Sequence, residues 1–245
     1  MPDPIKNAVP GYWRLSRAHR YSLLFALPLL TAYELLELVA PVKMQGGVIR
    51  NGADVILTSL FTALFGIRGP SVFMALVIGI SLWLIWRDKA SGRPRPVVFL
   101  GMLLEAGALA LVFGLVVGTA TARLLGPLRS LAAPAGADSE SARLTLSLGA
   151  GLYEELLFRV IIVSALANAF RLLGFGRLFA GGAATVIGAL LFSAFHYIGP
   201  LGEPLRLESF VFRALAGVAF SLLYLTRGFG ITAWTHALYD MAILL

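Results

Sequence analysis

The chain has 245 residues, of which 58% are hydrophobic and only 13% are charged. An ordinary soluble domain has about a quarter of its residues charged, and a soluble protein this apolar could not cover its surface with polar atoms. The composition therefore excludes most soluble proteins, and it excludes intrinsic disorder, which needs few apolar residues and many charges. It predicts an all-α polytopic membrane protein, because a helix in lipid satisfies its own backbone hydrogen bonds.

The charge balance limits the partners and the chemistry further. The chain has a net charge of +7 and no cysteine, so disulfides, thiolate nucleophiles and thiolate metal sites are excluded. The basic residues are scattered between apolar runs, and we therefore expect membrane lipid as a partner and no nucleic acid. The excess positive charge is expected in cytoplasmic loops that face anionic lipid.

Seven apolar runs are long enough to cross a bilayer. The first follows a basic stretch and is interpreted as an uncleaved span, because a signal peptide has a shorter apolar region and a small-residue cleavage site. A shorter run, 55–67, lies in the interface, re-enters or crosses with tilt, so the bundle has seven or eight spans. The positive-inside rule favours seven by a narrow margin. In chain order the seven runs are 21–40, 71–86, 97–122, 144–168, 178–198, 209–226 and 229–245.

The longest polar segment, residues 126–143, is rich in Ala, Pro and Ser and is predicted to be a linker. It divides the chain into two parts of one membrane bundle. Residues 1–143 hold spans and connectors without a diagnostic motif, whereas residues 144–245 hold the motifs described next.

Two adjacent carboxylates, Glu154 and Glu155, lie about ten residues into the span 144–168. A charge inside a span is costly and marks a functional hypothesis. Glu155 and Arg159 share a helical face and can pair, whereas Glu154 points about 100° away on a regular helix and is left for another role. The alternative is a structural ion pair plus one protonated glutamate that packs helices, although a second unpaired carboxylate adds cost without a packing gain.

Two histidines fall in later spans. Taken alone, His196 is more often a hydrogen-bonded core residue than a catalyst. His236 and Asp240 are four residues apart on one face, where a carboxylate can fix the imidazole tautomer; an intrahelical hydrogen bond is the plainer interpretation. A bundle can bring such groups to one buried polar cavity, and together they suffice for water activation and oxyanion stabilisation.

Three motifs in this order on successive apolar helices resemble the CPBP family, which includes the type 2, Ras-converting CAAX proteases and the Abi proteins. The resemblance covers about residues 144–245. It implies an eight-helix bundle and an intramembrane endopeptidase that cleaves a membrane-associated protein or peptide, in a bacterial or archaeal cytoplasmic membrane. Prenylated CAAX proteins, sorting signals and peptide precursors all remain open as substrates. The three motifs are Glu154-Glu155…Arg159, Phe192…His196 and His236…Asp240.

Carried over to this sequence, the resemblance implies that Glu154 is the general base that activates water. His196 would help to hold that water, and Glu155 with Arg159 would support Glu154. His236 would bind the carbonyl oxygen as it becomes an oxyanion.

The last motif departs from the commonest family pattern, because Asp240 stands where Asn is usual. An ionised aspartate cannot donate to an oxyanion. We therefore expect Asp240 to accept a hydrogen bond from His236 and so to orient it.

The cofactor stays open at this point. Family members are described both as glutamate-dependent and metal-free and, in older naming, as metalloproteases. We expect a metal-free site on the resemblance, with zinc as the alternative. Glu154, His196 and His236 would then be three ligands with an open fourth position.

Two other classes of function also remain open. One is a catalytically silent immunity or binding protein on the same scaffold. The other is a proton-coupled transporter that uses buried glutamates as a relay, although the paired halves with broken helices typical of transporters are not found. The His-Glu-x-x-His motif of zinc proteases is absent, and an aspartate dyad is not expected because only Asp240 lies in a predicted span.

Four further charges in or near the spans are given no catalytic role. Glu105 and Arg213 are expected to pair with each other or with Arg159 and Glu154. Glu34 and Glu37, near the end of the first span, are expected to reach the membrane interface.

Overall fold

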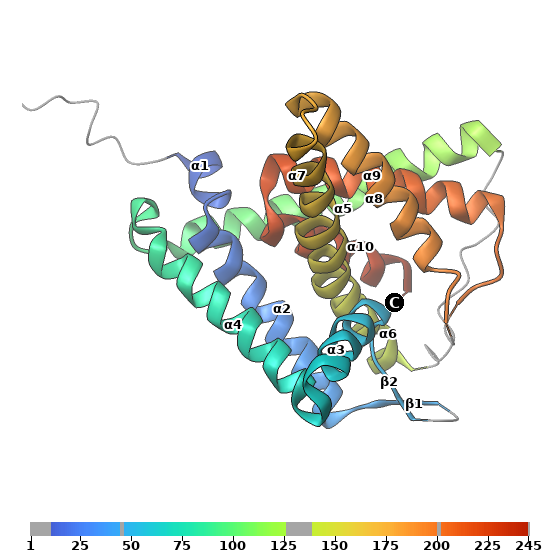
Figure 1. Ribbon diagram of the computed structural model, residues 1–245, viewed down its shortest axis with the longest axis horizontal. Helices are drawn as coiled ribbons and strands as arrows, with labels where there is room; N and C mark the ends of the chain where they lie inside the picture. The colour runs from blue at the N-terminus through green and yellow to red at the C-terminus, as the bar shows by residue number, and fades with distance from the viewer. Residues whose placement is uncertain (1–10, 45–46, 126–138, 200–201, 245) are drawn as a thin grey trace, which may run out of the picture.

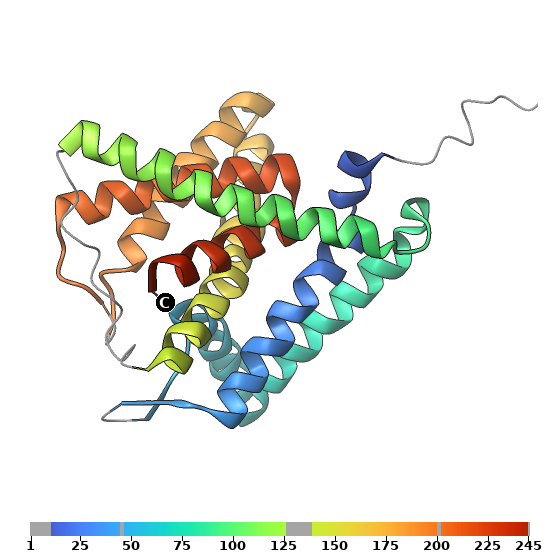
Figure 2. The ribbon, with the colours of Figure 1, turned by 180° about the vertical axis from the view of Figure 1, so that it is seen from behind.

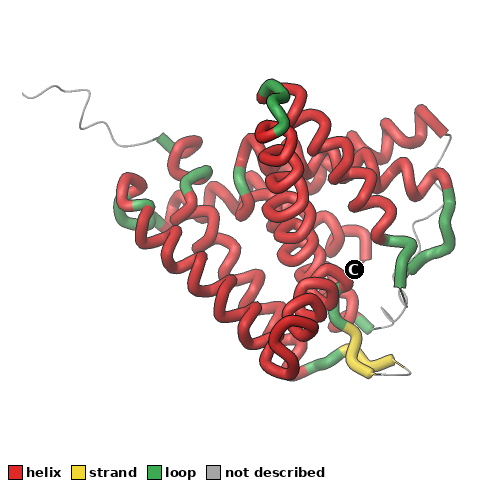
Figure 3. Tube along the Cα trace, in the orientation of Figure 1, coloured by secondary structure: helices red, strands yellow, loops and turns green. Residues whose placement is uncertain are grey.

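The computed structural model describes residues 11–44, 47–125, 139–199 and 202–244. These residues form a helical bundle with a single small hairpin, so the prediction of an all-α membrane bundle is confirmed (Figures 1 and 3). The hairpin pairs β1 (Val42–Met44) with β2 (Gly47–Ile49) in antiparallel register. The α-helices are α1 (Tyr12–Ser16), α2 (His19–Val39), α3 (Gly52–Phe65), α4 (Gly69–Arg87), α5 (Pro96–Leu125), α6 (Glu140–Gly149), α7 (Ser164–Leu172), α8 (Arg177–Phe195), α9 (Leu207–Arg227) and α10 (Phe229–Leu244).

Among the described residues, five helical stretches are long and apolar enough to cross a membrane. They are α2, the combined stretch Gly52–Arg87, α5, α8 and α9. The protein is therefore an integral membrane protein. The long helix α5 runs across the back of the bundle, where it packs against α9 and α10 (Figure 2).

The short apolar run 55–67 forms most of α3, which folds back against α4. Its 14 residues rise only about 21 Å, less than the hydrocarbon core of about 30 Å, and the stretch long enough to cross is the combined Gly52–Arg87. Two glycines allow the reversal: Gly66 has a φ of 61°, and a Cβ on Gly69 would lie 2.3 Å from the backbone nitrogen of Thr62.

The predicted linker is shorter at its C-terminal end than the sequence suggested. The side chain of Ser139 accepts a hydrogen bond from the backbone N–H of Ala142 and caps α6, which begins at Glu140. Residues 126–138 of the predicted linker lie outside the described residues.

The helix that carries Glu154 and Glu155 is continuous from α6 to α7, but it is not a regular α-helix. Residues Ala150–Glu154 and Leu156–Val163 form π-helical turns, which are wider than α-helical turns and recur at functional sites. The backbone of α10 packs closely against these turns: a Cβ on Gly151 would lie 2.4 Å from the carbonyl oxygen of Ala233. A glycine at this position therefore lets α10 bring its own side chains next to the two glutamates.

The ion-pair partners predicted for Glu105 and Arg213 are wrong. Glu105 pairs with Arg227 at 2.5 Å, and Arg213 pairs with Glu203 at 2.5 Å. Arg227 is the last residue of α9, and Glu203 lies in the loop before α9. The spacing of three or four residues predicts pairs within one helix only, so it could not indicate the Glu105–Arg227 and Arg213–Glu203 pairs.

Glu34 and Glu37 lie near the end of α2. Glu34 contacts the guanidinium of Arg50 at 3.1 Å and accepts a hydrogen bond from Tyr153 at 2.6 Å, and Glu37 is buried. The side chain of Glu34 is still 33% exposed, and its reach to the membrane interface stays a prediction.

Candidate active site

A cavity of about 200 Å³ opens among the C-terminal helices and the start of α3. Four of the residues singled out from the sequence line it: Glu154, His196, His236 and Asp240. Glu155 and Arg159 lie behind this wall and are almost fully buried. Much of the remaining lining is aromatic or aliphatic, with Phe113, Leu146, Phe192, Phe195, Ile198, Phe212, Phe220 and Ile243.

Glu154 uses only one of its two carboxylate oxygens in hydrogen bonding. Oε1 accepts from the side-chain amide of Asn51 at 2.9 Å. Oε2 is buried, without a hydrogen-bond partner, and lies 4.0 Å from Nε2 of His196. A buried carboxylate oxygen is normally satisfied, so this free oxygen at a cavity wall is the unusual feature of the site.

His196 stands directly after the last residue of α8, and its own helix orients its ring. Nδ1 lies 2.8 Å from the carbonyl oxygen of Phe192. Since a carbonyl can only accept, Nδ1 carries the proton, and in the neutral ring Nε2 keeps a lone pair. That lone pair faces Oε2 of Glu154 across a gap too long for a direct hydrogen bond and suited to one bridging water.

Glu155 connects two of the predicted motifs. Its Oε2 forms an ion pair with Nε of Arg159 at 3.2 Å, as the four-residue spacing indicated, and its Oε1 lies 2.7 Å from Nδ1 of His236. Oε2 of Glu155, like Oε2 of Glu154, has no hydrogen bond, but it faces a guanidinium at 3.2 Å, whereas Oε2 of Glu154 lies 4.0 Å from an imidazole.

Aromatic rings complete the surroundings of these charges. The guanidinium of Arg159 lies 4.4 Å from the ring centre of Phe192 and 5.4 Å from that of Phe220. The ring of His236 stacks on Phe220 at 4.3 Å. Cation–π contacts of this kind partly replace the water that a buried guanidinium loses.

Asp240 lines the cavity, but the structure gives the orienting hydrogen bond of His236 to Glu155. The Oδ2 atom of Asp240 is 3.6 Å from Nε2 of His236, which is outside hydrogen-bond distance. The spacing of four residues correctly placed the two side chains on one face; a second helix supplied the nearer carboxylate, and no helical spacing could reveal it.

Asn51 is the site residue that sequence reasoning missed. It lies in the N-terminal part of the chain, 103 positions before Glu154, between the apolar runs 21–40 and 55–67. Its one signal was local: Asn before an apolar run is a typical N-cap, and Asn51 does cap α3 by accepting from the N–H of Ala53.

Asp54 is a second aspartate that lies in an apolar helix, because α3 begins at Gly52. The sequence had placed only Asp240 in a span. Asp54 is fully buried and contacts Tyr33 and Arg50. It is not among the residues that line the cavity, so the structure does not bring it together with Asp240 as a dyad.

The alternative zinc ligands Glu154, His196 and His236 all border the cavity. Among the described ranges, however, no group of three or more His, Asp or Glu side chains is arranged to hold a metal ion. One nitrogen of each ring is already engaged, with Phe192 for His196 and with Glu155 for His236.

The fold and the site together define a polytopic helical membrane protein with a buried cavity that joins carboxylates and imidazoles. Residues 141–242 match the family model of the type II CAAX prenyl endopeptidases described as Rce1-like. The matched segment contains all three motifs, confirms the resemblance to CAAX proteases and supports a protease. Comparison of the chain with curated proteins and with solved structures gives no match.

Proposed function

We propose that this protein is an intramembrane endopeptidase in which Glu154 activates a water molecule for attack on a peptide bond. The observation that carries the proposal is the free Oε2 of Glu154, buried at the cavity wall and 4.0 Å from Nε2 of His196. One water between these atoms would donate to both. As it attacks the carbonyl carbon, its proton passes to Oε2 of Glu154, which can later deliver it to the leaving amine.

His236 is proposed to stabilise the oxyanion. Its Nδ1–H donates to the carboxylate of Glu155, and Asp240 faces Nε2. The oxyanion role requires the doubly protonated ring, in which Nδ1–H donates to Glu155 and Nε2–H is a donor at the cavity wall. The 3.6 Å separation from Asp240 leaves this N–H free to bond the developing oxyanion.

The substrate class is proposed from the cavity and the family. An aromatic and aliphatic lining around one polar wall suits a membrane-associated peptide or protein with apolar side chains next to the scissile bond. The family match makes a prenylated CAAX peptide the first substrate to test.

The route of the water oxygen tests the mechanism. One turnover of excess enzyme in ¹⁸O-labelled water should place the label in the new carboxylate of the product, as read by mass spectrometry. If Glu154 were instead a nucleophile, it would form a mixed anhydride with the acyl group, which added hydroxylamine would trap as a hydroxamate; direct attack by water gives no such adduct. The wild-type protein should cleave the peptide, whereas a catalytically silent binding protein would not. Solute uptake into liposomes driven by a proton gradient would instead favour a transporter.

The zinc alternative is tested separately. We expect active protein to contain less than stoichiometric zinc by elemental analysis, and chelation to leave cleavage unchanged. Stoichiometric zinc whose removal stops cleavage and whose return restores it would replace the metal-free mechanism.

A further inference from the structure

Asn51 reaches Glu154 from a part of the chain that lies outside the matched family segment. We propose that Asn51 is a positioning residue, which holds one oxygen of Glu154 so that the other faces His196, and that a ring of polar contacts fixes Asn51 in turn. The inference rests on the proposed function, because it assumes that Glu154 is the base.

The amide of Asn51 is held in a single orientation. Its Oδ1 accepts from the backbone N–H of Ala53 at 2.9 Å, which leaves Nδ2 to donate to Oε1 of Glu154 at 2.9 Å. If the amide were flipped, its NH₂ group would face the N–H of Ala53, and its oxygen would face the carboxylate of Glu154. Both contacts would then be unfavourable. Asn51 is buried at the wall of the cavity, and both polar ends of its amide are engaged within the protein.

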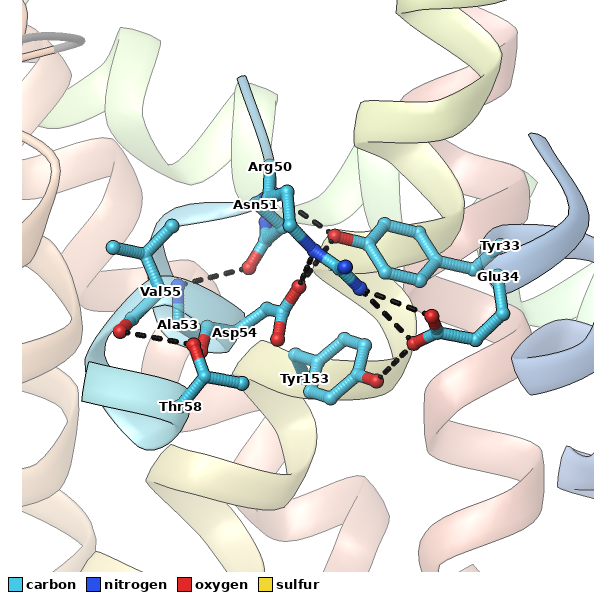
Figure 4. Close-up of polar contacts among 9 residues, drawn as sticks. All are labelled: Tyr33, Glu34, Arg50, Asn51, Ala53, Asp54, Val55, Thr58 and Tyr153. Atoms are coloured by element: carbon cyan, nitrogen blue, oxygen red, sulfur yellow. Dashed lines mark hydrogen bonds and ion pairs between the residues drawn. The ribbon is translucent and has the colours of Figure 1, made fainter. Parts of the chain in front are cut away.

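The backbone of Asn51 is fixed as well. Its N–H donates to the hydroxyl of Tyr33 at 3.2 Å, and that hydroxyl donates to Oδ2 of Asp54 at 2.8 Å (Figure 4). The same oxygen of Asp54 contacts Nε of Arg50 at 2.5 Å. Arg50, Asp54 and the hydroxyl of Tyr33 thus hold the start of α3 against α2.

The contacts then return to Glu154 by a second route. Arg50 extends between two carboxylates in Figure 4, and its terminal nitrogen lies 3.1 Å from both oxygens of Glu34. Glu34 accepts from the hydroxyl of Tyr153 at 2.6 Å, and Tyr153 precedes Glu154 in the chain. The ring therefore holds both the side chain of Glu154 and the backbone next to it.

Gly149 provides the space for this arrangement. A Cβ at this position would lie 2.6 Å from Cβ of Asn51 and 2.7 Å from the ring of Tyr33. Real Cβ atoms do not approach so closely, so the start of α3 can reach the motif helix only over a glycine.

An amide suits this role better than a charged group would. A nearby cation would stabilise ionised Glu154 and make it a weaker base, whereas a neutral donor fixes the carboxylate with less effect on its basicity. Holding Oε1 also removes the freedom of the carboxylate to turn Oε2 away from the bound water.

The test separates the cap of α3 from the contact with Glu154. Asn51→Ser keeps a good N-cap acceptor but is too short to reach Glu154. We expect kcat to fall at least about tenfold, in line with loss of a hydrogen bond to a charged group, while KM and the melting temperature stay near wild type. Ser139→Ala is the matched control, because it removes the cap of α6 away from the cavity and should leave kcat unchanged.

A second pair of variants tests the ring. Tyr33→Phe removes the acceptor for the N–H of Asn51 and should lower kcat less than Asn51→Ser does. Added to Asn51→Ser, it should lower kcat no further, because both act through the same contact. Independent, fully additive losses would contradict a ring that acts through Asn51.

Two results would overturn the inference. One is wild-type kcat in Asn51→Ser, and the other is a loss of activity that merely follows a lower melting temperature. Glu154→Gln, measured in parallel, separates the two hypotheses. If Glu154→Gln is inactive and Asn51→Ser is fully active, only the role of Asn51 fails; if Glu154→Gln is active, the base itself is misassigned.

Discussion

Several groups of charged side chains lie within this bundle, and two of them differ in what their carboxylates contact. One is the candidate active site around Glu154. The other, called here the Arg227 cluster, consists of Tyr12, Ser16, Glu105 and Arg227 and joins α1, α5 and α9. Only the first has a carboxylate oxygen that is buried beside a cavity without a hydrogen-bond partner.

In the Arg227 cluster both oxygens of Glu105 are engaged. Oε1 contacts Nε of Arg227 at 2.5 Å, and Oε2 contacts the terminal nitrogen of Arg227 at 2.7 Å and the hydroxyl of Tyr12 at 2.5 Å. Burial and the neighbouring carboxylate of Glu105 raise the pKa of Tyr12 to about 12, so the hydroxyl remains a donor. Both carboxylate oxygens of the cluster are thus satisfied, and the one atom of Arg227 that lacks a hydrogen-bond partner, Nη1, is a donor that does not line the cavity.

The comparison shows that a charge within a span does not by itself identify an active site. Glu105 and Glu154 are both glutamates inside apolar helices, and the sequence alone gives them equal cost. What separates them is that Glu154 keeps one carboxylate oxygen free at a cavity wall, whereas both oxygens of Glu105 are hydrogen-bonded. The four predictions that follow would break or sharpen this distinction, from the largest expected effect to the smallest.

Glu154→Gln should have the largest effect on catalysis. Gln keeps the size of Glu and can still bond Asn51 after rotation of its amide, but it cannot take a proton from water. We expect turnover of a membrane peptide to fall by about 10²–10⁴-fold, the range of general-base catalysis, with little change in melting temperature. Glu105→Gln is the matched control and should retain turnover per folded molecule. Equal losses in the two variants would erase the distinction between the clusters.

The sequence was sufficient to predict a helical membrane bundle and to find the three motifs because apolar length and helical spacing are local properties. It also indicated the Glu155–Arg159 pair, which lies within one helix. It could not show that Glu155 holds His236, that Arg227 pairs with Glu105, or that Asn51 holds Glu154. These contacts join residues far apart in the chain, and they depend on how helices pack over glycines such as Gly151.

Breaking the Glu155–Arg159 pair should affect stability and activity together. Glu155→Gln or Arg159→Leu leaves a buried charge without its partner, which typically costs about 3–5 kcal/mol. We expect a clear drop in melting temperature in detergent, plus loss of activity because Glu155 also orients His236. Melting at the wild-type temperature in both variants would show that the pair does not support the site.

Asp240 should have a smaller effect, because Glu155 already orients His236. We expect Asp240→Asn to be tolerated, since its amide can face Nε2 of His236 through oxygen or donate to the oxyanion through nitrogen. Asp240→Ala can do neither and should lower the single-turnover rate by about tenfold or less, below the value of a hydrogen bond to a charged group, because Oδ2 of Asp240 lies 3.6 Å from Nε2 of His236. Equal, large losses in both would mean that the negative charge itself is required, and a proton-carrying or metal-binding role would then gain support.

The Arg227 cluster should change activity least of all. Arg227→Met leaves the half-buried Glu105 without its ion-pair partner and should destabilise the fold by about 1–3 kcal/mol, while turnover per folded molecule stays at the wild-type value. The double variant Glu105→Gln with Arg227→Met removes both charges, so it should recover much of the lost stability, because the penalty of a broken pair lies mainly in the charge left behind. Thermal melts and single-turnover rates of the two singles and the double test this cycle. A single-turnover rate that falls in Arg227→Met without a matching loss of folded protein would show that the Arg227 cluster contributes to catalysis. A free carboxylate oxygen at the cavity would then no longer distinguish the two clusters.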